Sequence, residues 1–240
     1  MEFLGDVVRW FSDGGHWSGD AGVIHRLVEH ITMSGVSVVV AAALALPLGI
    51  WLGHTGRGAA LAVNLSNVGR AMPSFAILVL AAQVVGIGWK PAFAALVALG
   101  VPPMVTNAYV GVHEVDAGVR EAARGVGMTG RQSLWRVELP VALPLIMAGV
   151  RTAAVQVVAT ATLAALVAWG GLGRFIVDGI SQRDFVQVFA GATLVAVLSI
   201  VTELALAGLQ RTIVPEGLRR RESSKNEPFV GLAVGELATE

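Results

Sequence analysis

Apolar and polar residues do not alternate along this chain of 240 residues; they fall into long blocks. A helix that crosses the hydrocarbon layer of a membrane, roughly 30 Å thick, needs about 20 apolar residues, and five blocks reach that length. The pattern predicts an all-α membrane protein with about five transmembrane helices, over residues 31–52, 59–85, 92–110, 141–168 and 186–209.

Prolines and small residues refine these blocks. The second block is too long for one simple helix, and we expect a helix to about residue 70, a break at Met72-Pro73 and another helix from Ser74. Whether this is one broken span or two segments stays open. Pro47 is expected to kink the first span near its end, and Pro102-Pro103 to bend or interrupt the third. The fourth block is rich in alanine, which permits close helix packing and predicts an inner helix.

The two ends of the chain differ from its centre. Residues 1–28 carry apolar positions at helical spacing but are interrupted by glycines, so we expect an interfacial amphipathic segment that does not span the membrane. Residues 29–212 would form the transmembrane domain. Residues 213–240 are polar and are predicted to be a disordered cytoplasmic tail.

One polar stretch, Glu114 to Pro140, lies between the third and fourth blocks and is too highly charged to remain in hydrocarbon. Helix formers around Glu121 give way to glycines at positions 125, 127 and 130, and helix-forming residues resume at Gln132. We therefore expect a loop over residues 114–138 that projects into water and contains a helix, a turn and a second helix.

Composition excludes several classes of function. Hydrophobic residues make up 55% of the chain and charged residues 14%, against about 25% charged in soluble domains. The 17 basic residues balance the 17 acidic ones, so net charge gives no reason to expect a nucleic-acid partner. The chain has no cysteine, and its five histidines are scattered, which argues against a thiolate or metalloprotease site. It has no P-loop, and the G-x-G-x-x-G match at residues 125–130 lacks the βαβ context of a dinucleotide site.

Basic residues are distributed unevenly between the two sides that five spans would create. Ten lie on the side of the polar stretch and five on the other, so the positive-inside rule places the polar stretch and the C-terminus in the cytoplasm and the N-terminus outside. The ten are Arg57, Arg120, Arg124, Arg131, Arg136, Arg211, Arg219, Arg220, Arg221 and Lys225, and the five are Arg9, Arg26, Lys90, Arg174 and Arg183.

The polar stretch also carries a motif at fixed spacing. Glu121-Ala122-Ala123 is followed after three residues by Gly127, and after nine more by Val137-Glu138-Leu139-Pro140. This resembles the EAA loop of bacterial ABC-importer permeases, with valine in place of isoleucine. Asn107-Ala108-Tyr109-Val110-Gly111 and Gly170-Gly171-Leu172-Gly173 extend the resemblance, over roughly residues 36–211, to the osmoprotectant group, which imports glycine betaine, choline or carnitine.

The resemblance implies a type I ABC importer permease fold in the bacterial inner membrane. It also implies three kinds of partner: cytoplasmic ABC ATPase subunits, a second permease subunit that is identical or homologous, and an extracytoplasmic substrate-binding protein. ATP and magnesium would bind to the ATPase, so the chain itself would be neither an enzyme nor a cofactor carrier. The residues implied in coupling to the ATPase are Glu121, Ala122, Ala123, Arg124, Gly127, Leu139 and Pro140.

Two of these expectations concern local structure, and two rival functions stay open. Ala122 and Ala123 are expected to brace the short helix against the membrane end, and Gly127 to supply a turn that a side chain would strain.

A permease for methionine or another amino acid shares the loop. A passive channel or secondary carrier is a different class, but the sequence shows no internal repeat of the kind that many such carriers have.

Three charged residues fall within the predicted spans. A rise of ~1.5 Å per residue from the cytoplasmic boundary places Arg70 about 19 Å deep, Arg151 about 17 Å and Glu203 about 12 Å. A charge at such depth is costly unless it is paired or hydrated. These residues could line the translocation path or form a gate; alternatively, Arg151 and Glu203 pair and join the fourth span to the fifth. Trp169 could anchor in the membrane interface or meet a quaternary ammonium through cation–π attraction.

Overall fold

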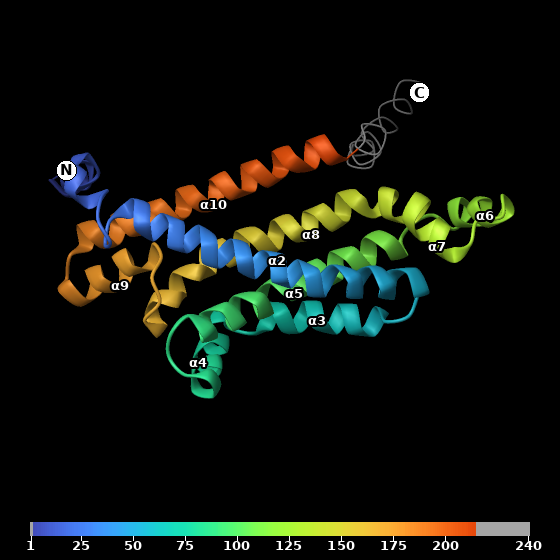
Figure 1. Ribbon diagram of the computed structural model, residues 1–240, viewed down its shortest axis with the longest axis horizontal. Coiled ribbons are helices and arrows are strands. Elements are labelled where there is room, and N and C mark those ends of the chain that lie inside the picture. The colour runs from blue at the N-terminus through green and yellow to red at the C-terminus, as the bar shows by residue number, and fades with distance from the viewer. Residues whose placement is uncertain (1, 215–240) are drawn as a thin grey trace, which may run out of the picture.

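A computed structural model of the chain describes residues 2–214, and every regular element in that part is helical. Figure 1 shows an elongated bundle in which the long helices run side by side. Of the predicted tail, 213–240, all but the first two residues lie outside the described part. The elements are α1 (Glu2–Ser12), η1 (Gly14–His16), α2 (Val23–Thr55), α3 (Ala59–Ala71), α4 (Ser74–Val85), α5 (Trp89–His113), α6 (Ala117–Gly125), α7 (Gly130–Ser133), η2 (Leu134–Glu138), α8 (Leu139–Thr160), η3 (Ala161–Val167), α9 (Gly173–Gln182) and α10 (Phe185–Ile213).

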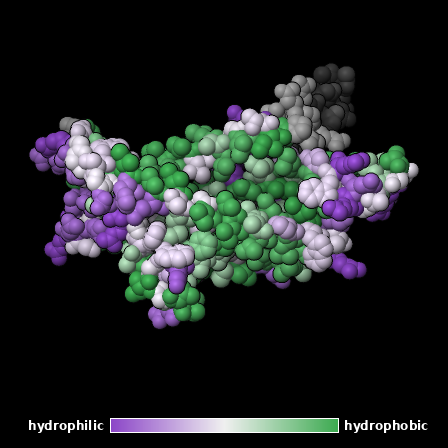
Figure 2. Space-filling view, in the orientation of Figure 1, coloured by the Kyte–Doolittle hydropathy of each residue, from purple (hydrophilic) through white to green (hydrophobic). Residues whose placement is uncertain are grey.

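Four helical runs are long and apolar enough to cross a membrane: α2, α5, the continuous run Gly130–Val167 and α10. The pair α3 and α4 is a fifth candidate, bent by 93° at the break between them. Figure 2 shows the matching surface, in which a hydrophobic band separates two hydrophilic ends. The prediction of an all-α membrane fold with about five spans is confirmed.

Helix α5 lies at the centre of the bundle and packs along both α2 and α8. Glycines let these backbones approach closely: a Cβ added to Gly49 of α2 would lie 2.6 Å from the carbonyl oxygen of Val105, and one on Gly149 of α8 would lie 2.9 Å from that of Pro103. Ala153 of α8 is completely buried in the same region. Small residues therefore make the fourth span an inner helix, as predicted.

The predicted break in the second block is confirmed, because α3 ends at Ala71 and α4 begins at Ser74. For the prolines of the third span, one of the two predicted outcomes is excluded. Of the bend or interruption predicted there, the interruption does not occur, because helix α5 runs continuously through Pro102-Pro103. Two lost backbone hydrogen bonds are tolerated there because α2 and α8 hold the helix along its length.

The first span begins earlier than expected. Helix α2 starts at Val23 instead of near Ile31, and so includes residues assigned to the interfacial segment. An Arg26–Glu29 ion pair at 2.9 Å, at the favourable i,i+3 spacing, supports this polar first part of the helix. A hydropathy pattern finds the apolar part of a helix and misses a polar extension beyond it.

Candidate functional site

The polar stretch projects from one end of the bundle as α6, α7 and η2, as Figure 1 shows. Helix α6 carries the Glu-Ala-Ala part of the motif. Glu121, Ala122 and Arg124 are exposed, whereas Ala123 is 5% exposed and faces inward. The expected bracing by two alanines thus holds for Ala123 alone, since a helix turns successive residues by about 100° and Ala122 points to water.

The turn after α6 depends on Gly127, whose φ is +82°. Its amide donates to the carbonyl of Arg124 at 2.9 Å, and the amide of Met128 donates to that of Ala123 at 3.1 Å, which closes the helix end. No atom lies within 4 Å of an added Cβ, so the position requires glycine for its backbone conformation and not for space. The predicted strain at this turn is confirmed, with no steric clash.

The loop returns to the bundle through α7 and η2. Thr129 and Gln132 form a capping box at the start of α7, in which each side chain bonds the other residue's backbone. The π-helical turn η2 follows, and the amide of Leu139 donates to Leu134 across it. Leu139 packs against the apolar cluster between α5 and α8, and Pro140 lies in the first turn of α8. These last two motif residues therefore connect the loop rigidly to the fourth span.

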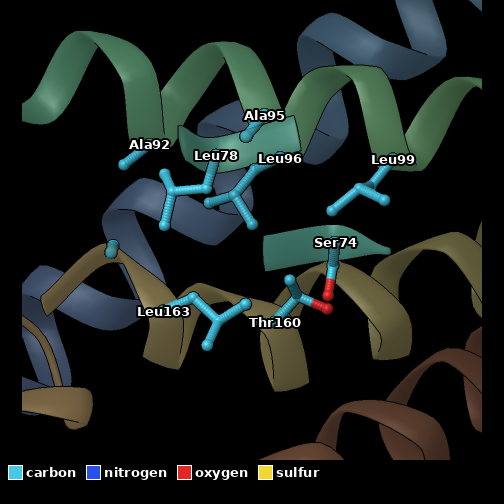
Figure 3. A pocket seen from close by; sticks show the side chains of 9 residues that line it. Ser74, Leu78, Ala92, Ala95, Leu96, Leu99, Thr160 and Leu163 are labelled. Atoms are coloured by element: carbon cyan, nitrogen blue, oxygen red, sulfur yellow. The ribbon is translucent and has the colours of Figure 1, made fainter. Parts of the chain in front are cut away.

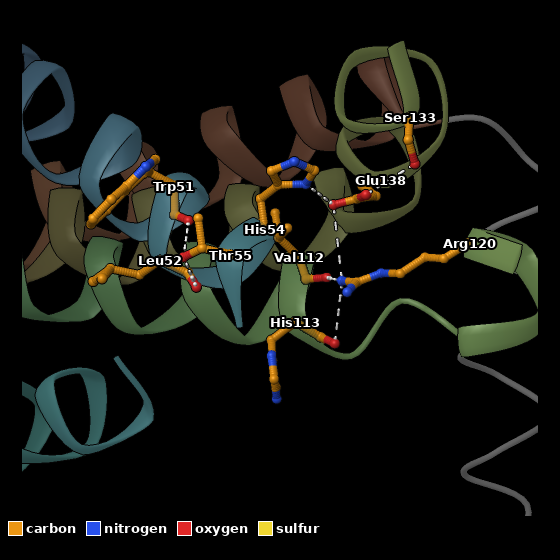
Figure 4. A network of polar contacts seen from close by, with 9 residues as sticks. All are labelled: Trp51, Leu52, His54, Thr55, Val112, His113, Arg120, Ser133 and Glu138. Atoms are coloured by element: carbon orange, nitrogen blue, oxygen red, sulfur yellow. Dashed lines mark hydrogen bonds and ion pairs between the residues drawn. The ribbon is translucent and has the colours of Figure 1, made fainter. Parts of the chain in front are cut away.

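The base of the loop is held by Glu138, whose side chain is buried with 4% exposure (Figure 4). Its Oε1 accepts a hydrogen bond from Ser133 Oγ of α7 at 3.0 Å. Its Oε2 lies 2.7 Å from Nδ1 of His54, in the last turn of α2. A carboxylate offers only acceptors, so Nδ1 of His54 carries the proton of this bond.

Arg120 extends this network to α5. Its guanidinium Nη2 donates to the carbonyl of Val112 and, at 3.4 Å, to that of His113, both in the last turn of α5. The same nitrogen lies 3.9 Å from Glu138 Oε2. A cation at a helix C-terminus satisfies carbonyls that have no partner within the helix and also complements the helix dipole. Through Arg120 and Glu138, the loop is attached to the ends of both α2 and α5.

Sequence reasoning singled out neither Glu138, Arg120 nor His54 as a site residue. Glu138 occupies a variable position of the motif, so the motif gave no reason to choose it. One signal was available: Glu138 is a charge placed directly before an apolar block, where a bilayer would demand a partner. Which partner it has depends on how three distant segments meet, and a single sequence does not reveal that.

The intramembrane charges form the contact that one of the two alternatives predicted. Arg151 Nε of α8 lies 3.0 Å from Glu203 Oε1 of α10. Arg151 Nη1 also donates to Gln210 Oε1 at 3.0 Å, and Gln210 Nε2 donates to the Pro144 carbonyl at 3.3 Å. Polar side chains thus join α8 to α10 over about two turns. Arg70 lies in α3, and its side chain is outside the described part.

The opposite end of the bundle has its own polar contacts, centred on the Gly-Gly-Leu-Gly turn before α9. Glu29 Oε2 of α2 accepts from the amide of Gly171 at 2.8 Å, and His30 Nδ1 accepts from that of Leu172 at 3.3 Å. His30 Nε2 therefore carries the ring proton and donates to the Val158 carbonyl at 2.9 Å. Two successive residues of α2 hold the turn by its backbone.

Trp169 and a small cavity lie near the same end. Trp169 is half-buried and packs against the apolar cluster of α4, α5 and η3, so its ring is not free at an open mouth. The cavity, shown in Figure 3, is lined by Ser74, Leu78, Leu96 and Thr160, among others. Its volume of about 10 Å³ has room for at most one water.

Within residues 2–214, no three His, Asp or Glu side chains are placed to hold a metal.

Comparisons with known proteins agree with this architecture. Residues 45–215 match the family model described as binding-protein-dependent transport system inner membrane component. The choline transport system permease protein OpuBB of Bacillus subtilis is 35% identical over 198 residues, which are 82% of this chain and 91% of the relative. The glycine betaine/carnitine/choline transport system permease protein OpuCB of the same organism is 34% identical, over 82% and 91%. A solved inward-facing structure of the MetNI methionine ABC transporter superposes with a TM-score of 0.69 at 22% identity, over 80% of this chain and 96% of that one. The predicted resemblance to osmoprotectant permeases is confirmed.

Proposed function

The chain belongs to the family of binding-protein-dependent transport system inner membrane components, and from this membership we propose a specific role. It is the transmembrane permease subunit of an ATP-driven importer for quaternary-ammonium osmoprotectants: glycine betaine, choline, carnitine or proline betaine. It forms the translocation path and couples it to a cytoplasmic ATPase through the loop at residues 114–138.

The observation that carries the substrate class is the similarity, over 82% of the chain, to permeases named for choline and for glycine betaine, carnitine and choline. The similarity to the methionine transporter rests on the fold at 22% identity and gives no information on the cargo. The amino-acid alternative is therefore weaker. A secondary carrier is weaker still, since the loop motif has its full spacing and projects from the bundle as a structured unit.

The ATPase docks on α6. Glu121, Ala122 and Arg124 present one small, charged, water-exposed surface at the tip of the bundle, and Gly127 fixes the turn beside it. Leu139 and Pro140 tie the loop to α8, so a push on α6 reaches the fourth span. ATP and magnesium bind to the ATPase subunit, and this chain neither hydrolyses ATP nor carries a cofactor.

The end that carries α6 and α7 is the cytoplasmic one, in agreement with the excess of basic residues on that side. The end with α1 and α9 faces outward, where α1 lies in the membrane interface and the substrate-binding protein delivers its cargo. A second permease subunit, identical or homologous, completes the path, because the one cavity described above is too small for a quaternary-ammonium solute.

Arg151 and Glu203 act as a structural pair, supported by the 3.0 Å contact and by the further bond from Arg151 to Gln210. Arg70 is the remaining candidate for a charged lining of the path. A positive lining would repel a cation but tolerate a zwitterion that carries a carboxylate. Trp169 supports the outer part of the bundle, and its packed ring gives no reason to assign it contact with substrate.

Two measurements test this function. Uptake of labelled glycine betaine by cells that express the transporter, in competition with choline, carnitine, proline betaine and methionine, tests the substrate class. We expect competition from one or more of the quaternary-ammonium compounds and none from methionine. Competition from methionine alone would overturn the proposal in favour of an amino-acid importer.

The ATPase contact is tested by Glu121→Lys. The residue lies in water, so we expect normal membrane insertion but loss of ATPase in a pull-down from membranes, and loss of uptake. Glu114→Lys is the matched control, because it makes the same charge change at an exposed position outside α6. Undiminished ATPase recovery and uptake in Glu121→Lys would contradict the proposed contact.

A further inference from the structure

The polar cluster at the base of the loop, formed by Glu138, His54, Arg120 and Ser133, has no counterpart in the motif that identifies the loop. Helix α6 packs mainly against α7 and η2, and its packing with α2 and α5 is minor. Residues 114–116 join α6 directly to α5 in the chain, so α6 reaches α2 only through η2 or the polar cluster, apart from its minor packing with that helix. Within the cluster, the Glu138 carboxylate is the one group that contacts side chains from α2, α6 and α7 together.

We propose that Glu138 is a positioning residue of the coupling loop: its contacts with Arg120 and His54 carry the movement of α6 to the end of α2, and it holds Arg120 where that side chain bonds the end of α5. This inference rests on the proposed function, because it assumes that an ATPase moves α6. It adds a second connection to the one through Leu139 and α8.

The geometry explains why a carboxylate of this length stands at position 138. Its two oxygens are used separately, Oε1 by Ser133 at 3.0 Å and Oε2 by His54 at 2.7 Å, with Arg120 at 3.9 Å from the second oxygen. Glutamine offers one acceptor oxygen and no charge. Aspartate is one methylene shorter and could not reach both sides from the same backbone position.

The cluster also has a feature expected of a contact that can rearrange. Among the described residues, the buried Nε of Arg120 has no hydrogen-bond partner, although the Nη2 of the same guanidinium is bonded to α5. Guanidinium donors are arranged in a fixed fork, so a shift of α6 can exchange one donor for another without breaking the ion pair. Side chains in such a contact can change rotamer and stay bonded when a helix moves. Backbone hydrogen bonds between two elements cannot adjust in this way.

The first test is a double-mutant cycle on the complex of permease, ATPase and binding protein in vesicles. The readouts are glycine betaine uptake per ATP hydrolysed and the ratio of substrate-stimulated to basal hydrolysis. Glu138→Ala should lower this coupling roughly tenfold, the size expected for losing a hydrogen bond to a charged group. If both residues act through one contact, adding His54→Ala should cause little further loss.

Glu2→Gln is the control for the first test, because Glu2 is exposed and lies in α1, outside the coupling loop. Glu138→Gln, which keeps the size of the side chain, guards against a variant that fails to fold. A purely structural role would lower the amount of assembled complex and leave the coupling of the remainder unchanged. That result, or additive losses in the cycle, would overturn the proposal.

The second test measures position directly and does not need the substrate. The chain has no native cysteine, so Arg57→Cys and Val126→Cys, both at exposed positions, can carry a pair of spin labels between the end of α2 and the tip of the loop. We expect Glu138→Ala to broaden the distance distribution and Glu2→Gln to leave it unchanged. An unchanged distribution in Glu138→Ala would contradict the inference, whereas a wild-type complex that transports no quaternary ammonium would contradict the proposed function alone.

Discussion

The two ends of the bundle hold their polar contacts in different ways. At the end that carries α9, proposed above to face outward and called the outer end, Glu29 and His30 bond the backbone amides of a glycine-rich turn, and the glycines leave no side chains that could interfere. At the end that carries α6, proposed above to be cytoplasmic and called the inner end, Glu138 contacts side chains from three other elements. Backbone amides have a fixed place once the chain is folded, whereas side chains can change rotamer.

The difference suggests that the outer contact is a fixed joint and the inner contact a movable one. Glycine at the outer turn is required by close approach: a Cβ on Gly170 would lie 2.0 Å from the Glu29 carboxylate, and one on Gly173 2.1 Å from the Thr162 carbonyl oxygen. In the inner loop, the glycine at 127 meets no neighbour at all. A joint without free volume resists movement, and a loop with open space around it allows movement.

The largest effect is expected from Gly173→Ala at the outer joint. The clash is with main-chain atoms of η3, which cannot step aside, so we expect a loss of about 3 kcal/mol in the free energy of unfolding. Thermal unfolding of the purified protein in detergent measures this. Gly208→Ala is the control, because no atom lies within 4 Å of its added Cβ. Equal unfolding temperatures for the two variants would refute the fixed joint.

The second-largest effect is expected from breaking the Arg151–Glu203 ion pair, which lies between the two ends of the bundle. Arg151→Ala and Glu203→Ala each leave a charge without its partner within a span, which costs about 2.5 kcal/mol, the lower end for a charge in a membrane helix. The double change should therefore yield more folded protein than either single change. Expression level and uptake are measured on the same three variants. A gate predicts instead that all three assemble normally and that the double variant transports no better than the worse single one.

The same substitution at both ends compares the joints directly. His30→Leu removes the partner of the buried Leu172 amide, and we expect it to lower the free energy of unfolding by about 2 kcal/mol. His54→Leu leaves Glu138 its bond to Ser133. Compared with His30→Leu, it should lower the free energy of unfolding less and reduce substrate-stimulated ATP hydrolysis more. Unfolding and hydrolysis are both measured for each variant. If the two histidines give the same pattern, the distinction between fixed and movable joints is lost.

The smallest effect is expected in the turn of the loop. Gly127→Val places a β-branched residue at φ +82°, a strain of about 1–2 kcal/mol that the local turn can partly relieve by opening. Gly130→Ala has no such strain, and its Cβ would lie 3.7 Å from His54 Nε2, an ordinary contact. Substrate-stimulated ATP hydrolysis should therefore fall more in Gly127→Val. Equal rates in the two variants would show that this turn does not limit coupling.

The sequence predicted what depends on local pattern. Apolar blocks located the spans, Met72-Pro73 located the break, and the Glu-Ala-Ala motif located the loop. The depths of Arg151 and Glu203, estimated from the rise per residue, made their pairing one of two alternatives, and the structure shows the contact.

What the sequence did not predict depends on packing between distant segments. Pro102-Pro103 has the pattern of a helix break, yet neighbours on both sides keep α5 continuous. His30 and Glu138 gain their partners from segments 142 and 84 positions away in the chain, Leu172 and His54 respectively. Local sequence rules do not specify these long-range contacts. The contacts nevertheless decide which polar residues are important for the structure.

The π-helical turn η2 has a consequence for how the loop is aimed. A π turn is equivalent to one residue inserted into an α-helix, and each residue of an α-helix rotates the chain by roughly 100°. Residues 134–138 therefore set the rotation of α6 and α7 about the axis of α8. Deleting one residue there would restore a regular α-helix and swing Ser133 away from Glu138. Substitution changes how firmly the loop is held, but only a change in chain length at η2 changes the direction in which it points.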